Sequence, residues 1–331
     1  MSEKTLTVRN LKVVFPLGHG LIRAVEGVDL DIHEGESVAL VGESGCGKSV
    51  TSQSVMRLIE SPPAITKVDR LEFLGDDLTA ISAKKMQDIR GNQMAMIFQD
   101  AQTSLNPVMT CGKQIDEMYI RHQGLSKKAA RVQTVEALKL VGIPQPESRA
   151  KNFPHELSGG MRQRVLLAMA FACMPKLIIA DEPTTALDVT IQAQVLNILR
   201  NMQRKHRVSL LLVTHDLSVV SNLSDIVYVM YSGKIVEKAS TKALFTTPHH
   251  PYTVGLLASV PKLSDKEKTF AQIPGTVPHP MKKPTGCYFH PRCRFATKRC
   301  KEQQPRLEPI GDNREVRCWH PRNHDEKEVQ K

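Results

Sequence analysis

The chain has 331 residues, 41% of them hydrophobic, and a formal net charge of +11. This length suffices for one large domain with an appendage or for two domains. The first residues, Met1 to Thr5, lack the apolar core of a secretion signal, and the longest apolar run, Val165 to Met174, is far below the ~18 residues of a membrane span. We therefore expect neither export nor a transmembrane helix.

Short β-rich runs fill the first 41 residues: Leu6–Val8, Leu11–Phe15, Val28–Ile32 and Val38–Val41. Asp29 and Asp31 alternate with apolar residues, as in a half-exposed strand. Phe15 is one of few aromatic residues here. Its ring either packs in the core or stacks on the adenine of a nucleotide.

The segment Gly42–Ser49 matches the phosphate-loop pattern G-x-x-x-x-G-K-[ST] at every fixed position. It lies between a strand-like run, Ser37–Val41, and a helix-like run, Val50–Ile59, which is the context that this motif requires. Its glycines let backbone N–H groups turn inward, and these groups hold phosphate oxygens together with the helix N-terminus. Lys48 is expected to reach the β- and γ-phosphates, and the Ser49 hydroxyl to bind Mg²⁺. The residues expected to bind nucleotide here are Gly42, Ser44, Gly45, Cys46, Gly47, Lys48, Ser49 and Val50.

The next predicted strand, Met94–Phe98, ends at Gln99. A polar-rich helical pattern follows from Gly112 to Gly142 and predicts a helical subdomain over about residues 100–160. Near its end, Ser158 is placed to cap a helix that runs from Arg162 to Cys173, and Gly159 and Gly160 open the N-terminus of this helix to an anion.

Three buried strands follow in alternation with helical patterns: Leu177–Ala180, Leu210–Val213 and Ile226–Tyr231. This alternation predicts a largely parallel sheet with helical crossovers. Ligands of such sheets bind at the carboxyl ends of the strands. Four polar residues lie immediately after predicted strands, namely Gln99, Asp181, Glu182 and His215.

These positions suggest separate chemical roles. Asp181 would hold Mg²⁺ through water, opposite Ser49, and Gln99 would ligate Mg²⁺ and sense the γ-phosphate. Glu182 would orient and deprotonate the attacking water, and His215 would bind the γ-phosphate and hold that water. We therefore take Glu182 and His215 as the candidate catalytic residues. Without the upstream phosphate loop, the Asp-Glu pair is equally typical of an ordinary helix N-cap.

After Pro261 the chain becomes rich in proline and loses its apolar periodicity, so it is expected to bury little core by itself. The segment Lys262–Lys331 carries 16 Lys and Arg against 9 Asp and Glu. This excess of positive charge indicates a solvated basic tail, an anionic partner such as a lipid surface or nucleic acid, or compensation of a buried anionic cofactor.

Four of the seven cysteines fall in this tail, spaced C-x5-C-x6-C-x17-C: Cys287, Cys293, Cys300 and Cys318. Without an export signal, such a cluster is typical of metal binding rather than disulfides. The C-x2-4-C pairs that are usual in zinc sites are absent, and four thiolates in a loop-rich segment suit a [4Fe–4S] cluster. Arg292 and other basic residues around the cysteines would offset the negative charge of such a cluster. Zinc and unligated thiols are the alternatives.

The order of these motifs resembles the ATPase subunits of ABC transporters, from about residue 5 to 240. The resemblance includes Leu157-Ser158-Gly159-Gly160-Met161 and Ala186-Leu187-Asp188. It implies an α/β phosphate-loop ABC ATPase domain (residues 1–260) with an antiparallel β subdomain and the helical subdomain. It also implies that ATP binds between two subunits, with Ser158, Gly159 and Gly160 of one subunit facing the phosphate loop of the other.

Finer similarity points to the oligopeptide and dipeptide permease branch. The similar segments are Met96–Asp100, Thr103–Pro107, Ala180–Thr190 and His250–Thr253, whereas Ala101 departs from the proline usual in that branch. Residues 261–331 resemble the C-terminal extension of some dipeptide-permease ATPases, which hold a [4Fe–4S] cluster on four cysteines.

The resemblance implies ATP, Mg²⁺ and the [4Fe–4S] cluster as cofactors. It implies three kinds of partner: a second ATPase subunit, expected to form a heterodimer, two transmembrane permease subunits and, through the complex, an extracytoplasmic peptide-binding protein. The chain would lie peripherally on the cytoplasmic face of the membrane and bind no nucleic acid. The alternatives are a nickel or metallophore importer and a non-transport ABC ATPase acting on nucleic acid or ribosomes.

Overall fold

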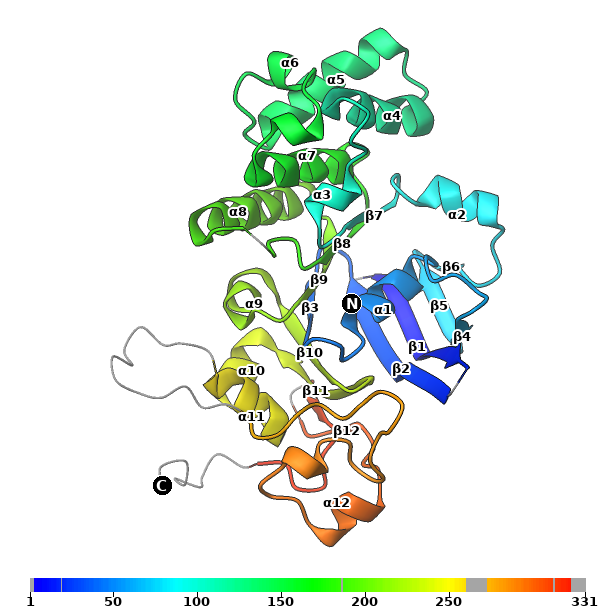
Figure 1. Cartoon of the computed structure of the whole chain (residues 1–331), viewed down its shortest axis with the longest axis vertical. Coiled ribbons are helices and arrows are strands. Elements are labelled where there is room, and N and C mark those ends of the chain that lie inside the picture. The colour runs from blue at the N-terminus through cyan, green and yellow to red at the C-terminus, as the bar shows by residue number, and fades with distance from the viewer. Residues whose placement is uncertain (1–2, 19, 186, 260–272, 312, 323–331) are drawn as a thin grey trace. The chain divides into compact units, whose positions relative to one another are not determined.

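A computed structural model of the chain (Figure 1) describes residues 3–18, 20–185, 187–259, 273–311 and 313–322. The chain divides into two compact units. The first unit comprises residues 1–7, 31–37 and 72–212, and the second comprises residues 8–30, 38–71 and 213–331. Ala186 and the expected domain boundary at residues 260–261 lie outside the described residues.

The second unit contains a sheet in which strands from the middle and the end of the chain lie side by side. Their order is β12 (Glu308–Pro309), β13 (Glu315–Val316), β11 (Lys234–Ser240), β10 (Ile226–Tyr231) and β3 (Ser37–Val41). β3 pairs in parallel with β10, and every residue of β3 is buried, as is typical of a parallel strand covered on both faces. β11 pairs antiparallel with both β10 and β13.

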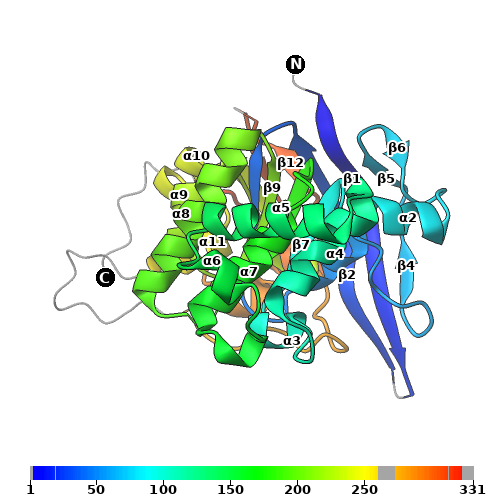
Figure 2. The same cartoon turned by 90° about the horizontal axis from the view of Figure 1, so that it is seen from above.

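Antiparallel strands of this unit form the expected β subdomain. β1 (Lys4–Leu17) lies beside β2 (Gly20–His33), as Figure 2 shows, and pairs antiparallel with β4 (Ile65–Lys67). β1 is one continuous strand, whereas the sequence predicted two short ones. The helices of the unit are α1 (Lys48–Val55), α9 (Leu217–Leu223), α10 (Thr241–Thr246), α11 (Pro251–Ala258), the 3-10 turn η2 (His290–Arg292) and α12 (Lys298–Glu302).

The core of the second unit includes side chains from the cysteine-rich tail. Phe289 is only 4% exposed and packs edge-on against Tyr231, with 5.3 Å between the ring centroids. The centroid of its ring lies 5.5 Å from that of Tyr252. Val316 of β13 is also buried. The expectation that the tail buries little core by itself is incomplete, because its few apolar residues join a core that the rest of the unit supplies.

The first unit combines a parallel sheet with a helical subdomain. Its sheet has the order β9 (Ser209–Thr214), β8 (Leu177–Asp181) and β7 (Met94–Ile97), and β7 and β8 pair in parallel. A hairpin of β5 (Arg70–Phe73) and β6 (Asp76–Asp77) precedes α2 (Ala83–Ile89). The remaining elements are α3 (Ala101–Ser104), α4 (Cys111–Gln123), α5 (Lys127–Leu140), α6 (Pro146–Arg149), the 3-10 turn η1 (Pro154–Glu156), α7 (Gly159–Phe171) and α8 (Val189–His206).

The helical pattern of residues 112–142 resolves into two helices rather than one. Gly124 ends α4 in the left-handed conformation at φ 66°, which a residue without Cβ adopts readily. Ser126 then caps α5 by accepting a hydrogen bond from the Ala129 N–H. α4, α5 and α7 pack against one another and confirm the helical subdomain (Figures 1 and 2).

In the part of the chain that the structure describes, no helix has both the length and the apolar character needed to cross a bilayer.

Replacing Phe289 by alanine tests whether the tail contributes to the core. Because Phe289 contacts buried aromatic rings, Phe289→Ala should lower the free energy of unfolding by about 3–5 kcal/mol, measured by denaturant titration. Phe295 of the same segment is 37% exposed, so Phe295→Ala should cost less than about 1 kcal/mol. Equal effects of the two changes would contradict a core role for Phe289.

Candidate phosphate-binding and hydrolytic site

The phosphate loop follows β3 and leads into α1, whose first two residues are Lys48 and Ser49, in the predicted strand–loop–helix order. Gly47 caps α1 at φ 107°, and a Cβ built on it would come within 2.4 Å of the Ala24 carbonyl oxygen. A Cβ on Gly42 would come within 2.2 Å of the Met230 carbonyl oxygen. Backbone from two other segments thus closes on the loop, and only glycine fits at either position.

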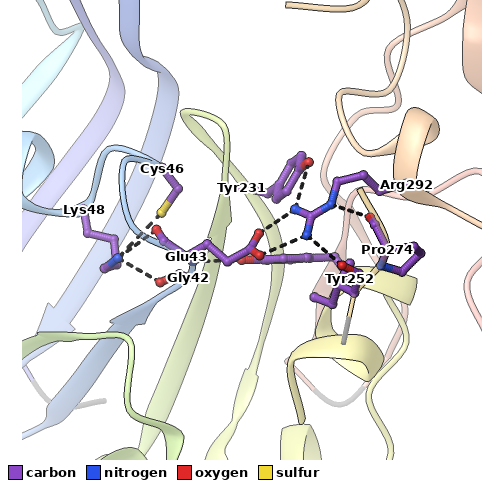
Figure 3. Close-up of polar contacts among 9 residues, drawn as sticks. Gly42, Glu43, Cys46, Lys48, Tyr231, Tyr252, Pro274 and Arg292 are labelled. Atoms are coloured by element: carbon purple, nitrogen blue, oxygen red, sulfur yellow. Dashed lines mark hydrogen bonds and ion pairs between the residues drawn. The ribbon is translucent and has the colours of Figure 1, made fainter. Parts of the chain in front are cut away.

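Lys48 is buried at 5% exposure and points back at its own loop. Its Nζ donates hydrogen bonds to the carbonyl oxygens of Gly42 at 2.8 Å and Glu43 at 3.0 Å (Figure 3). Nζ also lies 3.9 Å from the Cys46 Sγ, and burial raises the pKa of this thiol, which keeps it protonated at neutral pH. The ammonium group is therefore held inside the loop, where the phosphates of a nucleotide would replace the carbonyls as its partners. Ser49 is half-buried in the first turn of α1.

Glu43, inside the loop, pairs with an arginine of the tail. The Arg292 guanidinium binds the Glu43 carboxylate in a two-pronged manner, with Nη1 to Oε2 at 2.7 Å and Nη2 to Oε1 at 3.0 Å (Figure 3). The Glu43 N–H donates to the Tyr252 hydroxyl at 2.9 Å. The hydrogen bonds to Glu43 raise the pKa of Arg292 above its ordinary value, so the guanidinium stays charged.

The strand ends of the first unit bring Gln99 and Glu182 together. The Gln99 Nε2 donates to the Glu182 Oε2 at 2.9 Å, and the Thr185 hydroxyl donates to the same oxygen at 3.0 Å. Glu182 adopts the left-handed conformation at φ 46°, which costs energy for a residue with a side chain. The preceding Asp181 is only 3% exposed at the end of β8. Strain directly beside a buried carboxylate is typical of a functional site.

Ser158 and the two glycines after it form the N-terminus of α7. The Ser158 hydroxyl accepts a hydrogen bond from the Met161 N–H at 3.3 Å, which confirms the predicted cap. A Cβ on Gly160 would lie 2.6 Å from the Ile191 Cγ2 of α8, whereas a Cβ on Gly159 would meet nothing nearer than 3.8 Å. Gly160 thus allows α7 and α8 to approach closely.

The remaining two site residues lie in β1 and after β9. Phe15 is half-buried in β1, and His215 is exposed directly after β9, followed by Asp216, which caps α9. The phosphate loop and His215 belong to the second unit. Gln99, Asp181, Glu182 and the Ser158–Gly160 segment belong to the first.

All four tail cysteines line one pocket of the second unit, which has about 340 Å³ of empty space, part of it open to solvent. His250 and Phe289 also line it. The four cysteines are not in disulfides. Burial raises the pKa of Cys287 to about 11 and that of Cys318 to about 12, so both are thiols at neutral pH unless a metal displaces the proton. As the described side chains are placed, no three of their His, Cys, Asp and Glu groups converge on a single metal ion.

Two hydrogen bonds show what the segment His250-Pro251-Tyr252-Thr253 does in the structure. His250 is buried, and this burial lowers its pKa to about 3, so it stays neutral and its Nδ1 accepts the Tyr252 N–H at the start of α11. Tyr252 in turn accepts the Glu43 N–H. The segment therefore anchors the phosphate loop, a role that its composition did not reveal.

The sequence missed the roles of Glu43 and Arg292. Arg292 was counted among the basic residues that offset a cluster's charge, but its side chain is committed to Glu43 instead. Arg317 similarly donates to the carbonyls of Ile235 and Pro305. The one feature of the sequence that could have indicated this ion pair is the acidic residue Glu43 inside a phosphate loop. Its negative charge would repel a bound phosphate unless a cation lies nearby.

The glycines of the Ser158–Gly160 segment give a matched pair for testing the packing of α7 on α8. Both substitutions by alanine add the same helix propensity, but only Gly160→Ala overpacks the contact with Ile191. We expect Gly160→Ala to be less stable than Gly159→Ala by about 1–3 kcal/mol in denaturant titrations. If the two variants unfold at the same denaturant concentration, α8 has room to move away and the close approach is not required.

Comparison with known proteins shows the family. Residues 25–185 match the ABC transporter model, and residues 236–300 match the model of the oligopeptide/dipeptide transporter C-terminal region. The chain is 50% identical to the oligopeptide transport ATP-binding protein OppD of Bacillus subtilis (strain 168) over 96% of its own length and 90% of that protein's. It is 46% identical to the dipeptide transport ATP-binding protein DppD of Escherichia coli (strain K12) over 96% of each chain.

Among solved structures, the chain resembles the ATP-binding cassette MJ0796, determined as a dimer in a post-hydrolysis state bound to ADP and Pi. The TM-score is 0.64 and the sequence identity 25%, and the alignment covers 71% of this chain and 98% of that chain. The ABC ATPase fold with its β and helical subdomains, and the family expected from the motifs, are thereby confirmed. The chain belongs to the ATP-binding proteins of the oligopeptide and dipeptide ABC transporters, a family of ATPases whose activity is coupled to peptide transport.

Proposed function

We propose that this chain binds and hydrolyses ATP to power the import of dipeptides or oligopeptides through a multisubunit transporter. The observation that carries this proposal is the similarity to peptide-transport ATP-binding proteins over 96% of the chain, through the phosphate loop and the tail alike. A nickel or metallophore importer remains the alternative, because the substrate is bound by other chains.

The complete transporter would contain a second ATPase subunit, two transmembrane permease subunits and an extracytoplasmic peptide-binding protein. The chain would lie at the cytoplasmic face of the membrane. We assign residues 1–260 to the ATPase domain and residues 261–331 to a C-terminal extension. The phosphate loop of each ATPase subunit would face the Ser158–Gly160 segment of the other, so that each subunit contributes half of two ATP sites.

In the proposed mechanism, the phosphate loop and Lys48 bind the β- and γ-phosphates, and Lys48 exchanges the loop carbonyls for phosphate oxygens. Ser49, Gln99 and Asp181 offer the oxygen ligands that Mg²⁺ prefers, and the ion would neutralise charge on the phosphates. Glu182 takes the proton of the attacking water, and His215 positions the γ-phosphate. The Gln99 amide, already bonded to Glu182, orients the carboxylate until the nucleotide arrives. Phe15 would stack on the adenine.

We further propose that Cys287, Cys293, Cys300 and Cys318 hold a [4Fe–4S] cluster. What supports this is that all four thiols line the same pocket. When bound, the cluster would cross-link loops that have little regular structure, and ligation would stabilise their fold. Hydrolysis needs no redox step, so its role would be structural.

The proposed general base gives the first functional test. Glu182→Gln should keep ATP affinity but lower hydrolysis and peptide uptake by ~100-fold or more in the reconstituted transporter, because the amide cannot accept the proton. Lys48→Ala should instead lose nucleotide binding itself, as measured by calorimetry, because its charge neutralises bound phosphate. Near-normal turnover of the Glu182→Gln transporter would remove Glu182 from the role, and nickel-chelate uptake without peptide uptake would favour the alternative substrate.

The second test concerns the cysteines. Protein purified without oxygen should be brown and contain about four irons per chain, and Cys293→Ser should lose this colour. Cys173 lies outside the tail pocket, so Cys173→Ser should keep the iron. Stoichiometric zinc without iron in the anaerobic preparation would overturn the cluster assignment.

A further inference from the structure

Glu43 lies in the phosphate loop and is anchored there through three separate groups. Its carboxylate binds Arg292, its N–H donates to the Tyr252 hydroxyl, and its carbonyl accepts from Lys48. The same residue thus touches the tail on one side and the phosphate-binding lysine on the other (Figure 3). A displacement of the Glu43 side chain would move the carbonyl that holds Lys48.

Arg292 has no freedom to follow such a displacement. All five of its guanidinium N–H groups have acceptors: two bonds to the Glu43 carboxylate, one each to the carbonyls of Pro274 and Ile273, and one to the Tyr231 hydroxyl. The residue is 7% exposed. Bidentate pairs of this kind fix geometry as well as charge. The position of Arg292 therefore decides where the Glu43 carboxylate lies.

The position of Arg292 is in turn set by the cysteine pocket. Arg292 ends η2, a turn between Cys287 and Cys293 in which the His290 N–H donates to the Cys287 carbonyl and the Cys293 N–H to the His290 carbonyl. Both thiols line the pocket. A group ligated by both thiols would hold this turn at its two ends, and its loss would leave the turn to its hydrogen bonds and to the packing of Phe289.

The charge of Glu43 gives this connection a consequence for nucleotide binding. A carboxylate beside a loop that receives a polyphosphate repels it, unless a cation neutralises the carboxylate. Arg292 supplies that cation at 2.7 Å. If the turn loosens and Arg292 withdraws, the phosphate loop regains an unpaired negative charge, and affinity for ATP falls.

We propose that Arg292 is a positioning residue that couples the four-cysteine pocket to the phosphate loop through Glu43, so that occupancy of the pocket sets the affinity for ATP. The inference rests on the proposed ATP and cluster sites. Coupling of two binding equilibria is reciprocal, so bound ATP must also retain the group in the cysteine pocket.

A double-mutant cycle on the full chain tests the first link. Affinity for a non-hydrolysable ATP analogue with Mg²⁺ is measured by calorimetry for the unmodified chain, Glu43→Gln, Arg292→Met and the double variant. Arg292→Met should weaken binding about tenfold, a typical coupling between sites, and adding Glu43→Gln should restore it, because the unpaired charge is gone. Arg294→Met is the matched control, since Arg294 is exposed and stacks on Phe295, and it should leave the affinity unchanged.

The cycle has a clear failing outcome. If Arg292→Met and the double variant bind equally weakly, Arg292 acts only by supporting the fold, and the proposal is overturned. Equal affinity of all four chains overturns it as well. These outcomes leave the ATP site itself intact, because loss of binding in Lys48→Ala tests that site independently.

The second link is tested with iron. Chelation of iron, or Cys293→Ser, should weaken ATP-analogue binding in the unmodified chain but not in Glu43→Gln, where no charge remains to be released. The ATP analogue should slow chelator-driven iron loss, followed by absorbance, in the unmodified chain and not in Glu43→Gln. An equal effect of chelation in both chains would overturn coupling through Arg292. If Arg292→Met does not fold, the comparison of chelation in the unmodified chain and in Glu43→Gln tests the coupling by itself. A chain without iron refutes the cluster, and the four-chain cycle then still decides the Arg292–Glu43 link.

Discussion

Neighbouring backbone packs so closely on the phosphate loop that only glycine fits at two of its positions, and the shape of the loop depends on this constraint. Backbone carbonyls of Ala24 and Met230 approach the loop so closely that Gly42 and Gly47 have no room for a Cβ. The buried strand β3 ends at the loop, and α1 begins at Lys48. The loop is thus preformed by packing, so that its N–H groups need not be ordered by the nucleotide.

The residues proposed for hydrolysis are subject to a different constraint, which is the placement of the Glu182 carboxylate. Glu182 holds a left-handed backbone conformation directly after β8, and Gln99 and Thr185 both donate to its carboxylate. Strain of this kind persists only where surrounding structure over-determines it. In the proposed mechanism, the attacking water would donate to this carboxylate in place of one of these two donors.

The cysteine-rich tail is more integrated than its composition suggests. β13 adds to the edge of β11, Phe289 enters an aromatic core, and Arg292 pairs with the phosphate loop. A largely buried ion pair contributes little net stability, because desolvation offsets its Coulomb energy, but losing one partner is costly. Because of this asymmetry, the Arg292–Glu43 pair is better suited to fixing the position of the Glu43 carboxylate than to stabilising the fold. It can also transmit a movement of the tail to the phosphate loop.

The sequence by itself determined the elements that depend on local patterns. Residue spacing identified the phosphate loop, the Ser158 cap and the buried strands ahead of Gln99, Asp181 and His215, and the order of these motifs identified the family, because each rests on neighbours within a few positions. Two features could not be read in this way. The break between α4 and α5 depended on Gly124 adopting the left-handed conformation, which a glycine permits but does not dictate. The Arg292–Glu43 pair joins residues 249 positions apart, and only tertiary packing decided which of the tail's many cations would meet that carboxylate.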